Sequence, residues 1–236
     1  MAYAELVSAL VEAIRGETAL PPMPADLSLE DGYAIQKQVV AALADGDVAG
    51  WKAGMTAAAG QAAFGLTHPL IGSLYRWGRR ENGAALDMVN GVKLECEIGI
   101  TIDSDGNPKS AGPVIEVPRM AWNSADDAKG SNLTATNIAA YLYIVGEQQA
   151  FRDDYEQLSV SLTRDGEAVC EAQLSDALGG PVPALQWMLE EAQARDMSPA
   201  DNMLLITGAC GGIHDGVPGN YVADYGPLGT IEFSIS

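Results

Sequence analysis

Two apolar segments separated by a turn constrain the fold of this chain more than any other feature. From Lys93 to Thr101 every second residue is apolar, which is the pattern of a β-strand with one face in a protein core. A second apolar segment, Val114 to Val117, follows a region that contains Asp105-Gly106, a dipeptide typical of tight hairpin turns. The sequence therefore predicts an antiparallel hairpin in which residues equally distant from this dipeptide face each other.

The remaining elements are read from hydrophobic spacing and turn residues. Apolar residues at helical spacing from Leu6 to Ile14 indicate a first helix, and Ser28 caps a second helix that ends at Asp45-Gly46. A third helix is predicted over Pro183 to Ala194. Further strands are expected at Tyr141 to Val145 (which also fits a helix), Val160 to Thr163, Ala168 to Ala172, Met203 to Thr207 and Thr230 to Ile235, with a hairpin turn at Arg164-Asp165-Gly166.

This order of elements is typical of an α+β fold that is rich in strands in its second part. Apolar residues make up 47% of the 236 positions, which is enough for a packed core. The chain has no internal repeat, low-complexity tract or long linker. We therefore expect a single domain over residues 1–236, with a helical N-terminal portion at 1–48 and a β-rich core at 49–236.

Charge and composition exclude several classes of function. With 13 basic and 32 acidic residues the formal net charge is −19, so the chain repels phosphate backbones and anionic lipid, and we expect no nucleic-acid or membrane partner. The longest apolar stretch, Ile138 to Val145, is too short to span a bilayer, and the first twenty residues lack the basic start of an export signal. Cys96, Cys170 and Cys210 lack CxxC spacing, so a cytoplasmic location is expected.

Three glutamates on the predicted hairpin form the sharpest chemical feature. Glu95 and Glu97 lie two positions apart and point to the same side of their strand, with Cα atoms about 6.5 to 7 Å apart. Glu116 faces Glu95 in the register set by Asp105-Gly106. Three close carboxylates repel one another unless they bind protons or a cation, and an all-oxygen site selects Mg²⁺ or Mn²⁺. On pattern alone, a solvated strand face is the more common outcome for such glutamates.

The glutamates also belong to a series of motifs that resembles a known family. Gly50 to Thr56, Lys93 to Ile98 and Pro113 to Glu116 are similar, in this order, to successive motifs of the 2-keto-4-pentenoate hydratase group within the fumarylacetoacetate hydrolase superfamily. The likeness extends to four more segments and so spans nearly the whole chain: Leu29 to Gln36, Asn137 to Gly146, Asp201 to Gly208 and Leu228 to Thr230.

The resemblance implies a fold, a reaction and a set of residues. The fold would be a β-rich roll with flanking helices, assembled as a homo-oligomer. The reaction would be hydration of a 2-hydroxy-2,4-dienoate to a 4-hydroxy-2-oxo acid in aromatic catabolism, because a cation on the 2-oxo oxygen stabilises charge that moves onto it. Glu95, Glu97 and Glu116 would hold Mg²⁺ or Mn²⁺. Lys52 would lie beside the substrate as a catalytic residue that orients or protonates it. Without the motif around it, Lys52 also fits a surface lysine paired with acidic neighbours.

Several positions depart from the family pattern. The family's acid or base aspartate is replaced by Leu70, and the neighbouring His68 is a candidate substitute because imidazole titrates near neutral pH. The spacing between Glu97 and Glu116 is shorter than usual for the family. The resemblance further places Asn137, Gly208 and Cys210 at the substrate, although the residues that follow Asn137 differ from the family's.

Other functions remain open at this point. A decarboxylase or C–C bond hydrolase uses the same enolate-stabilising site, and the missing aspartate also fits a non-catalytic relative that binds a small acid. Cys210 and His214 can be read as a nucleophile and base, although no orienting residue is apparent.

Overall fold

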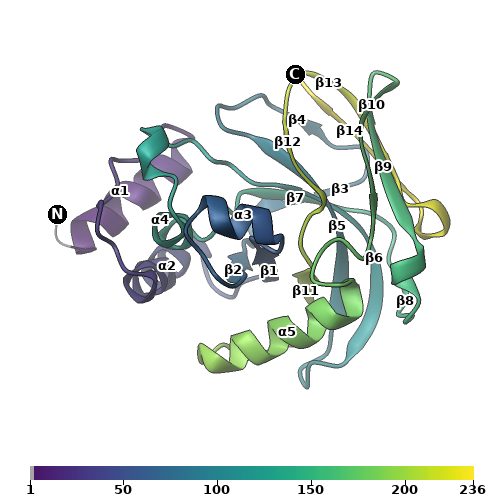
Figure 1. Cartoon of the computed structure of the whole chain (residues 1–236), viewed down its shortest axis with the longest axis horizontal. Helices are drawn as coiled ribbons and strands as arrows, with labels where there is room; N and C mark the ends of the chain where they lie inside the picture. The colour runs from purple at the N-terminus through teal and green to yellow at the C-terminus, as the bar shows by residue number, and fades with distance from the viewer. Residues whose placement is uncertain (1–2) are drawn as a thin grey trace.

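The structure is a computed structural model that describes residues 3–236. It combines two sheets with five α-helices among the described residues (Figure 1). The helices are α1 (Tyr3–Arg15), α2 (Leu29–Leu43), α3 (Ala58–Ala63), α4 (Gly130–Ala135) and α5 (Pro181–Ala194). Helices α1, α2 and α4 gather at the N-terminal end of the molecule, and α5 packs against strands of the larger sheet. The mixed architecture matches the predicted α+β class.

The larger sheet carries the predicted hairpin. Its main path runs in the order β2-β1-β11-β5-β6-β7-β3, with β12 also paired to β5 and β8 to β6. All neighbours are antiparallel except the parallel pairs β1–β11 and β3–β7. Its strands are β1 (Gly50–Gly54), β2 (Leu70–Leu74), β3 (Arg79–Glu81), β5 (Lys93–Ile102), β6 (Pro108–Val117), β7 (Leu142–Val145), β8 (Gln149–Ala150), β11 (Met203–Ile206) and β12 (Cys210–Asp215).

The smaller sheet has the order β10-β9-β13-β14-β4. Its strands are β4 (Ala85–Leu86), β9 (Ser159–Arg164), β10 (Glu167–Gln173), β13 (Gly219–Asp224) and β14 (Thr230–Ile235). The predicted turn between β9 and β10 is present, with positive φ angles at Asp165 and Gly166. The two sheets share one large apolar core with α5, in which Ile98, Leu162 and Met188 are fully buried.

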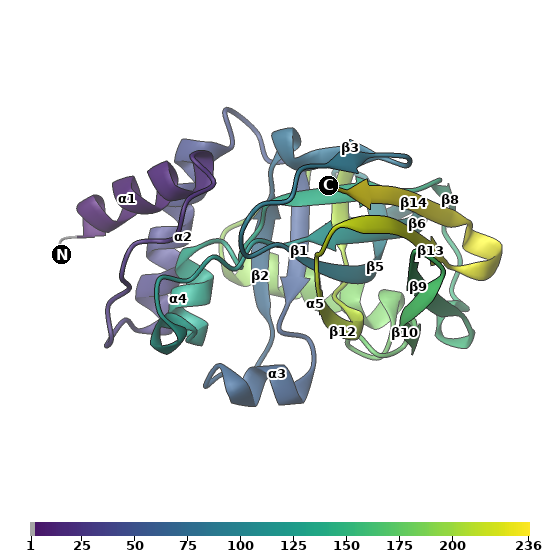
Figure 2. The ribbon, with the colours of Figure 1, turned by 90° about the horizontal axis from the view of Figure 1, so that it is seen from above.

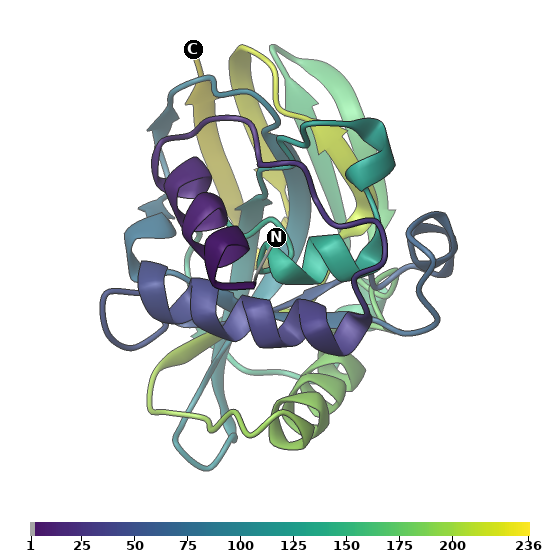
Figure 3. The same ribbon diagram turned by 90° about the vertical axis from the view of Figure 1, so that its left-hand side faces the viewer.

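Helices α1 and α2, together with α4, lie at one end of the larger sheet (Figure 3). Ser28 caps α2 as predicted, since its hydroxyl oxygen accepts the backbone N–H of Asp31. Leu6 and Leu10 of α1 pack with Ile35 and Val39 of α2 in a second apolar cluster. That cluster also includes Tyr75, so the helices are fixed to the chain that follows β2.

The hairpin register is as predicted, but its turn is not. Glu95 pairs directly with Glu116, and the pairing continues to Thr101 and Ser110. Next to the loop the register shifts by one residue, and the connection spans residues 103–107 rather than two residues. The carboxylate of Asp103 organises this loop by accepting the backbone N–H groups of Asp105 and Asn107. A bulge therefore preserves the register around a longer loop.

Several elements were not predicted from the sequence. Strand β2 (Leu70–Leu74), whose residues are all buried, was not among the predicted strands. The short strand β1 and the short helices α3 and α4 were also missed because they offer few residues of periodic pattern. Helix α3 projects from the body of the molecule (Figure 2). None of the helices between residues 3 and 236 combines the length and apolar character that a bilayer crossing requires.

Candidate active site

Three carboxylates converge where β5 and β6 pair. One oxygen from each of Glu95, Glu97 and Glu116 lies within 4.8 Å of the others. Glu97 and Glu116 are almost completely buried, at 0% and 1% exposure, and Glu95 is half-buried. A solvated strand face, the common outcome for such a pattern, is therefore excluded. Buried carboxylates this close together need a cation or bound protons.

The oxygens of this cluster are only partly satisfied. Gly208 donates its backbone N–H to Glu97 Oε2 at 2.6 Å, and Lys52 donates to Glu116 Oε1. Glu97 Oε1 and Glu116 Oε2 are buried and have no hydrogen-bond partner among the described residues. Because buried acceptors are normally paired, the two free oxygens are suited to hold a cation. Oxygen donors of this kind match a hard divalent cation.

The fold places Gly208 where no other residue fits. Strand β11 ends at Ile206, and the chain turns at Gly208, which has a φ of +105°. A Cβ atom there would come within 2.5 Å of Thr56 Cγ2. Glycine thus permits both the backbone angle and the close approach that aims its N–H at Glu97.

Lys52 is the buried cation of the site, with 2% exposure. It lies on β1, which is separated from β6 by β11 and β5 in the strand order, yet it forms an ion pair with Glu116. The larger sheet must therefore curl to bring β1 and β6 together. The Lys52 ammonium also donates to the carbonyl of Ile138 at 3.0 Å, which leaves one of its three donors for a ligand.

A strained turn supplies that carbonyl. Asn137, Ile138 and Ala139 all have φ angles between +55° and +57°, a left-handed conformation that is unusual for residues other than glycine. The Asn137 side chain supports the turn by accepting the backbone N–H of Ser73 and donating to its carbonyl, both at 2.8 Å. Such strain is typical of functional sites, where the surrounding structure holds it in place.

The charges of the cluster shift one another's proton affinity. Burial raises the pKa of Glu95 to about 8, with a further contribution from Glu116 that Lys52 partly offsets. Burial, followed by the charges of Glu116 and Glu95, raises the pKa of Glu97 well above its usual range. For Lys52, burial favours the neutral form, but the glutamates outweigh it and raise its pKa. Without a metal, the cluster therefore retains protons near neutral pH.

A cavity of about 510 Å³ opens onto the cluster. Its lining is mostly apolar and includes Met55, Phe64, Met120, Ile138 and Ile213. Four lining residues have polar side chains, namely Lys52, Thr56, Glu95 and Asp176. The cavity thus combines a mostly apolar lining with a few charged side chains, as is common for small-molecule sites.

Comparison with known proteins finds similar hydratases, although no family model matches the chain. The chain is 28% identical over 228 residues to the TodF product hydratase of Pseudomonas putida, covering 86% of this chain and 83% of that protein. It is 25% identical over 203 residues to the 2-keto-4-pentenoate hydratase of Paraburkholderia phymatum, covering 79% and 78%. These relatives agree with the resemblance of the sequence motifs to the 2-keto-4-pentenoate hydratase group.

Solved structures establish the fold. The 4-oxalocrotonate decarboxylase from Pseudomonas putida G7, complexed with calcium and acetate, superposes with a TM-score of 0.87 at 18% identity, over 99% of this chain and 97% of that one. Fumarylpyruvate hydrolase from Pseudomonas aeruginosa, complexed with Mn²⁺ and pyruvate, gives a TM-score of 0.58 at 12% identity, over 78% and 88%. At these identities the likeness establishes the fold.

The other predicted site residues lie outside the cavity lining. His68 is exposed and borders a different cavity with Phe64 and Lys129, so we assign it no role in the reaction. Asn137 is buried and its side chain is occupied by Ser73. Gly208 contacts Glu97 rather than the cavity.

Cys210 does not behave as a nucleophile in this structure. It is 1% exposed, and burial, with added effects of Glu97 and Asp176, raises the pKa of its thiol. His214 contacts the carbonyl of Gly211 instead. The proposed nucleophile and base pair is therefore not formed.

Leu70, which replaces the family's aspartate, is fully buried on β2 and pairs with Gly54. Two contributions to the site were not predicted from the sequence, namely the carbonyl of Ile138 and the side chain of Asp176. Neither has a local sequence signal, because a carbonyl is present at every residue and Asp176 lies in a segment without periodic pattern.

Proposed function

We propose that this chain is a divalent-metal-dependent hydratase that adds water to a 2-hydroxy-2,4-dienoate and forms a 4-hydroxy-2-oxo acid. The observation that carries the proposal is the pair of unpartnered, buried oxygens on Glu97 and Glu116, which cluster with Glu95, a residue of the mostly apolar cavity lining. The names of the curated relatives, which are hydratases, support the choice of reaction.

Glu95, Glu97 and Glu116 fit the role of ligands for Mg²⁺ or Mn²⁺. They supply carboxylate oxygens only, and two of these are buried without a partner. When bound, the cation would supply Lewis-acid stabilisation of the negative charge that develops on the 2-oxo oxygen. The Gly208 N–H fixes the orientation of the Glu97 carboxylate, so this ligand would be positioned before the cation binds.

Lys52 provides the second positive charge of the site. Two of its donors are held by Glu116 and the Ile138 carbonyl, and the side chain lines the cavity. We propose that its remaining donor hydrogen-bonds to the carboxylate or 2-oxo group of the substrate. This contact would orient the head of the substrate and favour the enolate form.

The lining of the cavity favours hydration over the alternative decarboxylation. Among the described residues that line it, Lys52 is the only cation, and it is already paired with Glu116. A second carboxylate on the substrate would therefore enter an apolar wall without a partner, which is unfavourable. The related decarboxylase from Pseudomonas putida G7 also has a complex with magnesium and adipate, a dicarboxylate. We propose that this chain takes a monocarboxylate with an uncharged tail.

The direct test measures loss of the dienoate's ultraviolet absorbance in the presence of Mg²⁺ or Mn²⁺, with products identified by mass. The purified chain should add one water to 2-hydroxypenta-2,4-dienoate, and chelation with EDTA should abolish this activity. A matched reaction with 4-oxalocrotonate should give little or no carbon dioxide. Release of carbon dioxide from the dicarboxylate without hydration of the monocarboxylate would contradict the proposal.

Three further expectations from the sequence stay predictions. They are the homo-oligomer, the cytoplasmic location and the single domain over residues 1–236 with its division at residue 48. The oligomer can be measured directly by light scattering of the purified protein.

A further inference from the structure

Hydration needs a group that accepts a proton from water, and the family's aspartate is replaced by buried Leu70. The four polar side chains of the cavity limit the candidates. Lys52 is a cation held by Glu116, and Glu95 belongs to the proposed ligand set. The Thr56 hydroxyl is too weak a base to accept the proton. Asp176 is the one remaining group with suitable chemistry.

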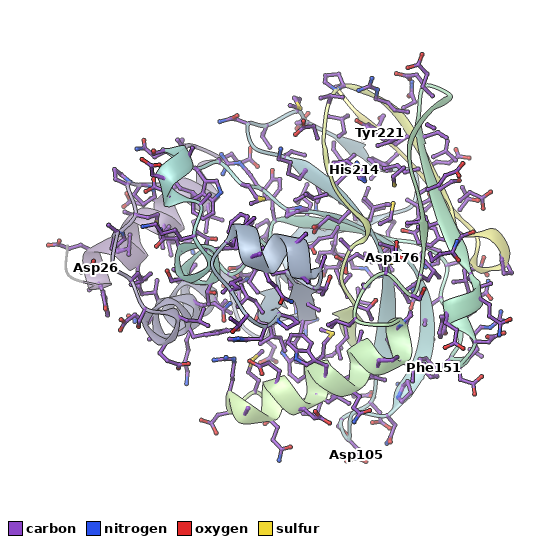
Figure 4. The ribbon with its side chains drawn as sticks, in the orientation of Figure 1. Asp26, Asp105, Phe151, Asp176, His214 and Tyr221 are labelled. Carbon is purple, nitrogen blue, oxygen red and sulfur yellow. The ribbon has the colours of Figure 1, made fainter. Side chains whose placement is uncertain are left out.

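The chain around Asp176 holds it at the cavity wall. Leu174 and Ala177 are buried on either side of it, and the backbone N–H of Asp176 donates to the carbonyl of Gln173 at 3.1 Å. The thiol of Cys210 contacts the Leu174 carbonyl at 3.8 Å, which ties this segment to β12. In Figure 4 Asp176 is labelled near the centre of the view, close to the N-terminal end of α5. Its position is therefore set by packing on both sides.

The carboxylate of Asp176 is free and accessible to water. Between residues 3 and 236 this carboxylate has no ion-pair partner and no side-chain hydrogen bond. Asp176 also borders a second, more polar cavity of about 640 Å³ with Glu171 and Asp224. It is exposed, so it stands between a polar, solvated surface and the apolar reaction cavity.

Asp176 lines the same cavity as Glu95 of the glutamate cluster. Apart from burial, the charges that raise the pKa of the Cys210 thiol come first from Glu97 and then from Asp176. Cys210 pairs with Cys96, which stands between Glu95 and Glu97 on β5. A substrate whose head is at the glutamates would thus have its tail within the same cavity that Asp176 lines.

We infer that Asp176 is the general base for water addition, a catalytic residue at a position that differs from the family's aspartate; this inference rests on the proposed function. After the dienol has ketonised, Asp176 takes a proton from water as the C4–O bond forms and the C3–C4 π electrons move onto the 2-oxo oxygen. The same proton then passes to C3 as the enolate collapses. One water is added, and Asp176 returns to its carboxylate form.

The test separates ketonisation from hydration. Wild-type protein, Asp176→Asn, Asp176→Glu and the control Glu171→Gln are given 2-hydroxypenta-2,4-dienoate and Mg²⁺ in D₂O, and the products are followed by NMR. Asp176→Asn should still ketonise the dienol, with deuterium at C5. Its rate of hydration should fall by about 100-fold or more, so that the ketonised intermediate, 2-oxopent-3-enoate, accumulates. Asp176→Glu should recover part of the hydration rate, and Glu171→Gln should match the wild type.

Two outcomes would overturn the inference. One is an Asp176→Asn variant that hydrates at the wild-type rate, and the other is one that loses ketonisation and hydration equally, because a general base for water acts on the second step alone. Thermal unfolding of each variant checks that the fold is retained. If the wild-type protein itself leaves the dienoate unchanged, the proposed function fails, which is a distinct result.

Discussion

Glutamates on the two sheets of this molecule have opposite environments. On β14 of the smaller sheet, Glu232 alternates with buried Ile231 and Phe233 and is exposed to water. On β5 of the larger sheet, Glu97 is buried between strands that are covered on both faces. The same side chain is thus an ordinary surface group in one sheet and part of a charged cluster in the other. Burial, rather than residue type or spacing, creates the candidate site.

The largest expected difference between the sheets concerns activity. Glu97→Gln removes a proposed metal ligand, and hydration should fall by about 1,000-fold or more because a bound cation supplies several kcal/mol of transition-state stabilisation. Glu232→Gln, on the smaller sheet, should leave kcat/KM unchanged. The comparison is measured by dienoate turnover and by Mn²⁺ affinity from calorimetry. Equal activity in both variants would mean that the cluster has no part in the reaction.

Removal of a lysine ammonium group should lower stability strongly only where that group is buried. Lys52→Met leaves the Glu116 carboxylate buried without its partner, and we expect a loss of about 3 to 5 kcal/mol in the free energy of unfolding of the metal-free protein. Lys93→Met breaks the partly exposed ion pair with Asp215 and should change stability by less than about 1 kcal/mol. Urea unfolding with EDTA measures both. A similar small loss in both variants would argue against a buried ion pair.

Two asparagines extend the comparison to hydrogen bonds. Asn137→Ala removes both bonds to Ser73 and the support of the left-handed turn, so we expect a loss of about 2 to 3 kcal/mol, together with reduced kcat from a displaced Ile138 carbonyl. Asn220→Ala removes an exposed bond to Asp165 on the smaller sheet and should weaken stability by about 1 kcal/mol or less. An Asn137→Ala protein with wild-type stability would show that the turn needs no such support.

The smallest effect is a pH dependence confined to the cluster. Because the pKa of Glu95 is raised to about 8, the folded protein keeps a proton that the unfolded chain loses near its usual value. The metal-free protein should therefore lose stability as pH rises toward 8 and level off above it, with a fall in Tm of ~5 °C. Excess Mn²⁺ should reduce this fall, since the cation replaces the proton. A Tm of the metal-free protein that rises with pH over this range would contradict the assignment.

Part of the site was predictable because it is local. Alternation within Lys93–Thr101 and the turn signal at Asp105-Gly106 predicted the pairing of Glu95 with Glu116, and the structure confirms that register. The turn itself was predicted wrongly, since Asp103 organises a longer loop and a bulge absorbs the difference. His68 shows the limit of motif comparison. It is close in sequence to Leu70, which replaces the family's aspartate, but it does not line the cavity.

The sequence by itself determined the three glutamates, their hairpin and the helices before Trp51, because strand and helix periodicities act over a few residues. Only the tertiary structure decided that Lys52 meets Glu116, that Ile138 supplies a carbonyl, and that Asp176 lines the same cavity. These contacts join residues more than thirty positions apart through the curl of a sheet and the packing of connecting segments. No local pattern encodes them, since they follow from how the whole chain buries its apolar faces.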